Sequence, residues 1–292
     1  MSSASVISSE PYRDAYFQVS DGLRLHYRDY SGDASKPPLV CLPGLTRNSR
    51  DFEKLAERFS PRFRVLTLDF RGRALSDYDP QPERYMPFTY ANDVMQLLDQ
   101  LEIPEAIFVG TSLGGLVTMA IALIAPQRIV AAIMNDVGPD VSEDGIERIK
   151  SYVGTDVRFA DWDDAARIIA ANVGNSFEHY SHDDWVAMAK RNCREENGEV
   201  RFDYDMAIAV PFQTANSGPQ VDLWPFFRAL AAKPLLVVRG ANSDLLTATT
   251  AEKMQAEAPN MQLATVPGVG HAPDLDEPEA VAAISAFLDN LD

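Results

Sequence analysis

Short, wholly apolar runs alternate with amphipathic helical patterns over residues 16–135 and 234–288. A run without polar alternation predicts a strand that is buried on both faces of a sheet. The runs of this kind are residues 38–43, 106–109, 129–134 and 234–238, and residues 63–68 and 263–266, interrupted only by Arg64, Thr67 and Thr265, predict two further strands. Residues 16–19 and 23–30, separated by Ser20-Asp21-Gly22, predict an additional hairpin.

Helical periodicity occupies the intervals between these runs. Apolar residues recur every three or four positions, the spacing that places them on one helix face. The predicted helices are residues 52–59, 89–101, 113–125, 248–256 and 278–288. Alternating strands and helices predict the α/β class, here a mostly parallel eight-stranded sheet that is flanked by helices.

The middle of the chain differs from this pattern. Residues 138–220 contain no wholly apolar strand run, are rich in acidic residues and show helical periodicity. We therefore predict a core formed by residues 1–137 and 221–292, with residues 138–220 inserted as a helical cap.

Composition and charge narrow the functional classes. Lys and Arg number 26 and Asp and Glu number 43, so the formal net charge is −17. This charge repels nucleic acid and anionic membranes, and we expect neither as a partner. The two cysteines, Cys41 and Cys193, exclude a disulfide scaffold. The absence of a signal-peptide pattern predicts a cytoplasmic protein.

The most specific local signal is Gly110-Thr111-Ser112-Leu113-Gly114. It lies directly between a predicted strand and a predicted helix, the context of a nucleophile elbow. The serine sits on a tight turn there, and glycine is needed at both ends because a side chain would clash. We therefore predict Ser112 as a nucleophile.

A serine nucleophile needs a general base. His271, in Gly270-His271-Ala272, follows the last predicted strand and can reach the elbow. His26 is expected on the surface of a strand, while His179 and His182 are expected on a solvated face of the inserted segment. No ligand spacing predicts a metal site, and we expect no cofactor.

Two carboxylates are candidates to orient the imidazole of His271. Asp244 follows the predicted strand 234–238 and gives the chain order Ser, Asp, His. Asp136 follows the predicted strand 129–134 and is the alternative. Both loops open at the same edge of a parallel sheet, and Asp244 is the preferred assignment.

Two backbone N–H groups are candidates for an oxyanion hole. The N–H of Leu113 begins the helix after the elbow, where a developing anion is favoured. The N–H of Leu45 follows Pro43-Gly44 in the loop after an apolar strand. We expect these two donors to face the same reacting oxygen.

Together these elements resemble the α/β-hydrolase superfamily over residues 16–291, with a cap inserted after the sixth strand. The segment Asp69-Phe70-Arg71-Gly72-Arg73 is similar to a loop of that family. Pro43 stands where a histidine is frequent in the family's oxyanion loop, and Ala74 where glycine is usual. The resemblance implies a triad of Ser112, Asp244 and His271, with Leu45 and Leu113 as the oxyanion hole.

These features predict a serine hydrolase that cleaves a small or medium carboxylic ester or lactone through an acyl-enzyme. The alternatives are a carbon–carbon bond hydrolase acting on dienone ring-cleavage products and a ligand-binding protein without turnover. Ala272 after His271 disfavours the former, which usually has an aromatic residue there. The partner is a small-molecule substrate, and a homodimer remains open. The predicted pocket aromatics are Trp162, Trp185, Phe212 and Trp224.

Overall fold

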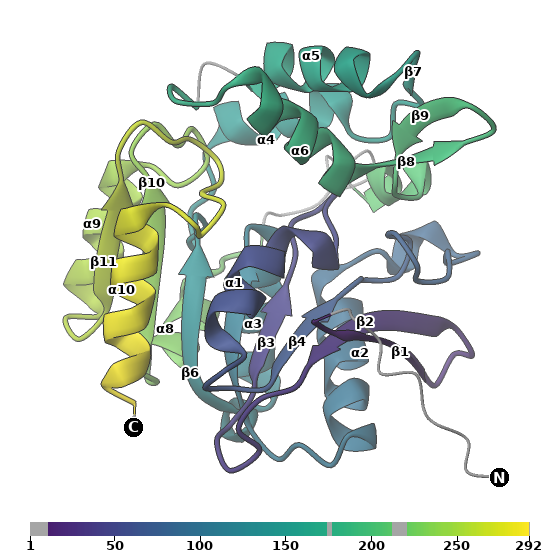
Figure 1. The fold of residues 1–292 in the computed structure, drawn as a ribbon. Helices are drawn as coiled ribbons and strands as arrows, with labels where there is room; N and C mark the ends of the chain where they lie inside the picture. Colours follow the sequence, from purple (N-terminus) through teal and green to yellow (C-terminus); the bar gives the residue numbers. More distant parts are fainter. Residues whose placement is uncertain (1–10, 174–176, 212–220, 292) are drawn as a thin grey trace, which may run out of the picture.

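An eight-stranded sheet forms the centre of the molecule, with helices on both sides (Figure 1). The computed structural model describes residues 11–173, 177–211 and 221–291. The strands of this sheet are β1 (Arg13–Gln18), β2 (Arg24–Tyr30), β3 (Leu39–Leu42), β4 (Val65–Leu68), β5 (Ala106–Thr111), β6 (Ile129–Asn135), β10 (Leu235–Gly240) and β11 (Gln262–Val266).

The strand order is β1-β2-β4-β3-β5-β6-β10-β11. The β1/β2 hairpin joins the sheet antiparallel to β4, and all strands from β4 to β11 run parallel to one another. This arrangement confirms the predicted mostly parallel sheet. Because Gly110 at the end of β5 is in register with Leu42 and Met134, the loops that follow three central strands leave from the same edge.

Helices cover both faces of the sheet, which explains the wholly apolar strand runs. In β5, Ile107 and Val109 pack in the cluster that contains α1 and α10, whereas Ala106 and Phe108 pack against the helices of the other face. The core helices are α1 (Glu53–Phe59), α2 (Pro87–Gln100), α3 (Leu113–Ile124), α8 (Trp224–Ala231), α9 (Ala248–Glu257) and α10 (Pro278–Asp289).

The segment between β6 and α8 lies over the carboxyl edge of the sheet (Figure 1). Its elements are α4 (Glu143–Tyr152), β7 (Arg158–Phe159), α5 (Trp162–Val173), α6 (His182–Asn192), β8 (Cys193–Glu196) and β9 (Glu199–Phe202). The predicted end of the insertion at residue 220 lies outside the described residues.

The inserted segment contains the predicted helices and also strands that were not predicted, because β7, β9 and β8 form a small antiparallel sheet. The β8/β9 hairpin turns at Asn197 and Gly198, which both have positive φ angles of 55° and 81°. An Asn-Gly pair is the strongest short-range hairpin signal in a sequence. Its flanking strands are charged, so they lacked the apolar runs that identified the other strands.

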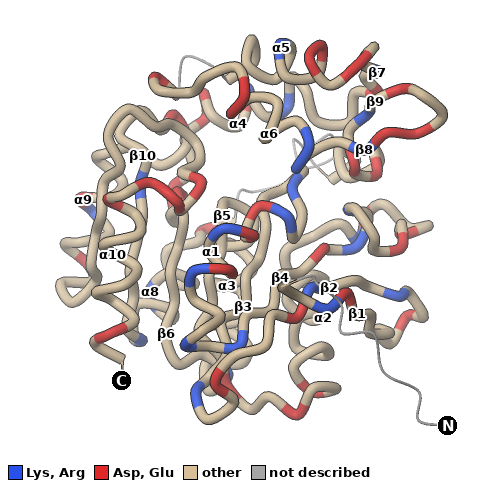
Figure 2. The backbone as a smooth tube through the Cα atoms, in the orientation of Figure 1, with Lys and Arg blue, Asp and Glu red and all other residues tan. Residues whose placement is uncertain are grey.

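Charge is distributed over the whole molecule. Acidic positions occur along the core and the inserted segment, interleaved with basic ones (Figure 2). None of the described helices is long and apolar enough to cross a bilayer. Cys41 is buried in β3, as its apolar neighbours predict.

His26 is buried, so its predicted surface position was wrong. Its side chain is 1% exposed, with Nδ1 2.7 Å from Asp69 Oδ2 and Nε2 2.9 Å from Asp14 Oδ1. The reason is that other side chains cover the imidazole. Asp69, which follows β4, binds one ring nitrogen, and the Tyr16 ring of β1 packs on it with centroids 5.1 Å apart.

The loop after β4 is fixed by a buried ion cluster. Arg71 contacts three carboxylates, with Nη1 2.5 Å from Asp79 Oδ2 and 2.8 Å from Asp21 Oδ2, and Nη2 2.6 Å from Asp93 Oδ1. Burial raises the pKa of Asp93 to about 6, although Arg71 opposes this effect. The cluster joins the loop to α2 and holds Arg73 of the same loop beneath the oxyanion loop described below.

Replacing Arg71 with glutamine is expected to lower the free energy of unfolding by about 3–5 kcal/mol, because it leaves the buried carboxylate of Asp93 without its cation, whereas Asp79 and Asp21 keep Arg84. Urea denaturation at neutral pH measures this change. The matched control is Arg158→Gln, whose ion pair with Glu199 is exposed and is worth about 0–1 kcal/mol. Equal effects of the two substitutions would contradict a structural role for the Arg71 cluster.

Candidate active site

Ser112 stands on a sharp turn between β5 and α3. Its φ angle is 51°, an uncommon backbone conformation for a residue with a side chain. A Cβ at Gly110 would lie 2.5 Å from the carbonyl carbon of Gly114, and one at Gly114 would overlap the carbonyl oxygen of Leu42. The two glycines therefore permit the turn that presents Ser112 at the carboxyl edge of the sheet.

His271 lies in the loop after β11 and reaches this turn. Its Nε2 is 3.0 Å from Ser112 Oγ, and its Nδ1 is 2.8 Å from Asp136 Oδ2. In the tautomer with a proton on Nδ1, the Ser112 hydroxyl donates to Nε2 and Nδ1–H donates to Asp136. Ser112, His271 and Asp136 thus form a continuous hydrogen-bonded chain, the arrangement that activates a serine.

The carboxylate beside His271 is Asp136, and the preferred assignment of Asp244 to this position was wrong. Asp136 directly follows β6 and is fully buried. Besides His271, it accepts hydrogen bonds from the Gly240 N–H at 2.9 Å and from the Ser243 hydroxyl at 2.5 Å. Three donors satisfy a buried carboxylate and fix its direction.

Asp244 is bound instead to a side chain of the inserted segment. Both of its oxygens accept hydrogen bonds from Arg148 of α4, by way of Nε and Nη2. Burial tends to raise the pKa of Asp244, but the hydrogen bonds and the charge of Arg148 outweigh it and lower that pKa below its ordinary value. Asp244, the carboxylate favoured by chain order, is therefore engaged in a bidentate ion pair with Arg148 and does not bind His271.

The predicted oxyanion donors lie beside Ser112. A Cβ built on Gly44 would be 3.9 Å from Ser112 Cβ, which places the Gly44-Leu45 turn next to the nucleophile. Within the described part of the chain, the N–H groups of Leu45 and Leu113 donate no hydrogen bond. Two unsatisfied donors beside a serine hydroxyl are suited to a developing oxyanion.

Arg73 supports this oxyanion loop from below. Its Nε donates to the Leu45 carbonyl oxygen at 2.9 Å, and its Nη1 donates to the Arg71 carbonyl oxygen and to the Tyr90 hydroxyl. The side chain is fully buried. The loop after β4, recognised in the sequence as similar to a family motif, thus fixes the backbone that carries Leu45.

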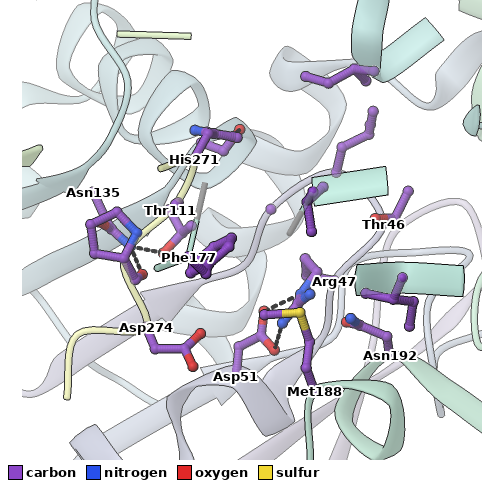
Figure 3. A pocket seen from close by; sticks show the side chains of 18 of the residues that line it. Thr46, Arg47, Asp51, Thr111, Asn135, Phe177, Met188, Asn192, His271 and Asp274 are labelled. Carbon is purple, nitrogen blue, oxygen red and sulfur yellow. Dashed lines mark hydrogen bonds and ion pairs between the residues drawn. The ribbon is translucent and has the colours of Figure 1, made fainter. Parts of the chain in front are cut away.

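Asn135 and Ser243 are site residues that the sequence analysis missed. Asn135 Nδ2 donates to Thr111 Oγ1 at 3.1 Å and to the Pro273 carbonyl oxygen at 2.8 Å, which ties the serine turn to the histidine loop (Figure 3). Asn135 could have been identified from the sequence, because it lies next to Asp136 at the end of a predicted strand. Ser243 lay one residue from Asp244, but only the fold directs its hydroxyl to Asp136.

A cavity opens above Ser112 and His271 toward the inserted segment (Figure 3). We call it the Ser112 cavity. Its walls are mixed, with charged side chains next to apolar ones. The apolar lining described includes Leu45, Phe52, Ile149, Ile169, Val173, Phe177, Met188, Phe202, Ala272, Pro273 and Leu275.

The predicted pocket aromatics do not line this cavity within the described residues. Trp185 is buried against Phe177, with ring centroids 5.7 Å apart, and Trp162 packs in the same cluster. Trp224 lies in α8, where its indole N–H donates to Asp140 at 2.9 Å. Phe212 lies outside the described residues. Aromatic content identified packing residues here, because both packing and lining require apolar side chains.

The remaining histidines take no part in this site. His179 and His182 are exposed, and His182 Nε2 is 3.0 Å from Asp163 Oδ1. The described residues contain no group of three or more His, Cys, Asp or Glu side chains arranged to hold a metal ion.

Comparison with known proteins extends these observations. The family model described as "Alpha/beta hydrolase family" matches residues 39–284. The crystal structure of an alpha/beta hydrolase from Novosphingobium aromaticivorans has a TM-score of 0.92 and 50% sequence identity, and covers 97% of this chain and 99% of that one.

Two curated relatives carry functional names. A "3-hydroxybutyrate-oligomer hydrolase" from Cupriavidus necator is 32% identical over 273 residues, which are 91% of this chain and 92% of the relative. A "2-(acetamidomethylene)succinate hydrolase" from Mesorhizobium japonicum is 28% identical over 258 residues, which are 87% and 89% of the two chains.

Proposed function

The chain belongs to the alpha/beta hydrolase family, and from this premise we propose that it is a serine hydrolase of short carboxylic esters. The observation that carries the proposal is the hydrogen-bonded chain Ser112–His271–Asp136 at the carboxyl edge of the sheet. Residues 138–220 act as a cap in this proposal, since α4, α5 and α6 all contribute to the Ser112 cavity.

The proposed reaction proceeds through an acyl-enzyme. His271 Nε2 takes the proton of Ser112 as the oxygen attacks the ester carbonyl carbon, and the Leu45 and Leu113 N–H groups bind the resulting oxyanion. Asp136 keeps the proton of His271 on Nδ1 and stabilises the imidazolium. His271 then protonates the leaving alcohol, and a water molecule, deprotonated by the same imidazole, releases the acid and regenerates Ser112.

The substrate class is supported by the cavity and by a relative. The units of a 3-hydroxybutyrate oligomer are joined by ester bonds, and the relative with that name aligns over nearly the whole chain. The mixed polar and apolar lining of the Ser112 cavity suits a short ester better than a long alkyl chain. We propose a small hydroxy-acid ester as the substrate.

The test combines turnover with covalent labelling. Purified protein is given p-nitrophenyl esters from acetyl to decanoyl and the linear 3-hydroxybutyrate dimer, and separately a fluorophosphonate probe. We expect an optimum at short acyl groups and a single labelled peptide that contains Ser112. If no ester is cleaved and Ser112 stays unlabelled, the proposal is wrong, and the dienone assay for a carbon–carbon hydrolase comes next.

A further inference from the structure

Arg148 brings a guanidinium group from α4 to the wall of the Ser112 cavity. Its side chain is 24% exposed, so the group is neither free in solvent nor sealed in the core. Among the described residues, four charged side chains line this cavity, namely Arg47, Arg148, Asp51 and Asp274. The two arginines differ in the positions of their counter-ions.

Arg47 faces the cavity together with its own counter-ion. Its Nε and Nη2 donate to Asp51 at 2.6 and 2.7 Å, and Asp51 lines the same wall (Figure 3). Asp274, further along that wall, is bound by Arg191 at 2.8 Å and by the Tyr180 hydroxyl at 2.6 Å. The charges on this side of the cavity are therefore neutralised locally.

Arg148 differs from Arg47, because the counter-ion of Arg148 does not line the cavity. Asp244 binds the Nε and Nη2 edge of Arg148 but is not part of the cavity lining. Arg148 also shares a side-chain hydrogen bond with Tyr152, so Asp244 is not its only partner. A guanidinium has five N–H donors, so the bonds to Asp244 and Tyr152 still leave donors of Arg148 for a ligand.

Tyr152 adds a second donor one helical turn away. It lines the cavity beside Arg148, and its hydroxyl accepts a hydrogen bond from the Arg148 guanidinium, which leaves the hydroxyl proton free to be donated to a ligand. Burial nevertheless raises the pKa of Tyr152 above its ordinary value, so the phenol keeps its proton at neutral pH. A carboxylate that accepts from a guanidinium can accept from this hydroxyl at the same time.

We propose that Arg148, assisted by Tyr152, binds a free carboxylate of the substrate, so that the preferred substrate is an anionic ester. The proposal rests on the proposed esterase function and names its substrate class. The subsite lies near the reacting groups, since Arg148, Ser112 and His271 line the same cavity. The net charge of −17 does not oppose it, because cavity potential depends on the lining side chains.

The competing explanation is that the Arg148–Asp244 pair only fastens the inserted segment to the core. The double variant Arg148→Gln/Asp244→Asn separates the two roles, because it removes the cation without leaving an unpaired carboxylate. The matched control is Arg50→Gln/Asp203→Asn, which neutralises another ion pair between core and insertion, at 2.6 Å and away from the cavity lining.

The substrates are monoethyl and diethyl glutarate, which differ in one free carboxylate. The readout is kcat/KM for the half ester divided by kcat/KM for the full ester. We expect the wild type to prefer the half ester and the Arg148 double variant to lose about tenfold to a hundredfold of that ratio, mainly through KM. The control should keep the ratio within about twofold.

Two results would overturn the proposal, namely a wild type without preference for the half ester or an unchanged ratio in the Arg148 double variant. A binding measurement keeps this test independent of turnover. Calorimetry with the Ser112→Ala protein should show tighter binding of monoethyl than diethyl glutarate, and adding the Arg148 double substitution should remove the difference. Binding without hydrolysis in the wild type would refute the esterase function alone, and equal binding of both esters would refute the carboxylate subsite.

Discussion

Replacement of Ser112 by alanine is expected to lower kcat for the preferred ester by about 10³- to 10⁶-fold. The reason is that the variant has no hydroxyl to form the acyl-enzyme, while the oxyanion donors and the cavity remain. Only the modest catalysis supplied by those donors and by substrate binding should persist. Initial rates at neutral pH, in a preparation free of host esterases, measure this change.

The matched control for this prediction is Ser35→Ala, which removes an exposed hydroxyl far along the chain from the serine turn. It should leave kcat unchanged. Near wild-type activity of Ser112→Ala would contradict the acyl-enzyme mechanism, even though the hydrogen-bonded geometry stands. A stable fold of the variant is expected, because Ser112 Oγ forms a side-chain hydrogen bond only with His271 among the described residues.

The strands and the serine turn could be predicted because their signals are local. A wholly apolar run such as residues 106–109 requires cover on both faces, and the sheet supplies it. The two glycines around Ser112 follow from one tight turn, whose steric demands involve neighbouring backbone atoms. In both cases the residues that form the sequence pattern are the same residues that form the predicted structure.

The rest of the site depends on contacts between distant segments. Trp185 and Phe177 are both apolar, but only the packing of α6 decides that Phe177 lines the Ser112 cavity and Trp185 lies behind it. His26 is buried because Tyr16 of β1 and Asp69 after β4 contact its ring. Neither outcome is encoded in the few residues around these positions.

The choice between Asp136 and Asp244 as the partner of His271 also depends on contacts between distant segments. Asp136 and Asp244 both follow parallel strands, so periodicity places both at the carboxyl edge of the sheet. Ser243 and Gly240 donate hydrogen bonds that orient Asp136 toward His271. Asp244 instead binds Arg148 of the inserted segment. The sequence predicted the edge of the sheet and the two candidates, whereas tertiary hydrogen bonds decided between them.

The variant Asp136→Asn is therefore expected to lose about 10⁴-fold in kcat, because an amide that donates to His271 favours the wrong imidazole tautomer. Asp244→Asn is the matched comparison, since it makes the same chemical change in the other candidate carboxylate. It should change kcat for a neutral ester by less than about tenfold, because Asp244 contacts Arg148 rather than His271.

Measuring both variants with the same neutral ester across a pH series decides the assignment. A large loss in Asp136→Asn alone supports the hydrogen-bonded chain that ends at Asp136. A larger loss in Asp244→Asn would mean that His271 changes its partner during the reaction. Comparable small losses would show that the burial of Asp136 by Gly240 and Ser243 serves the fold rather than the imidazole.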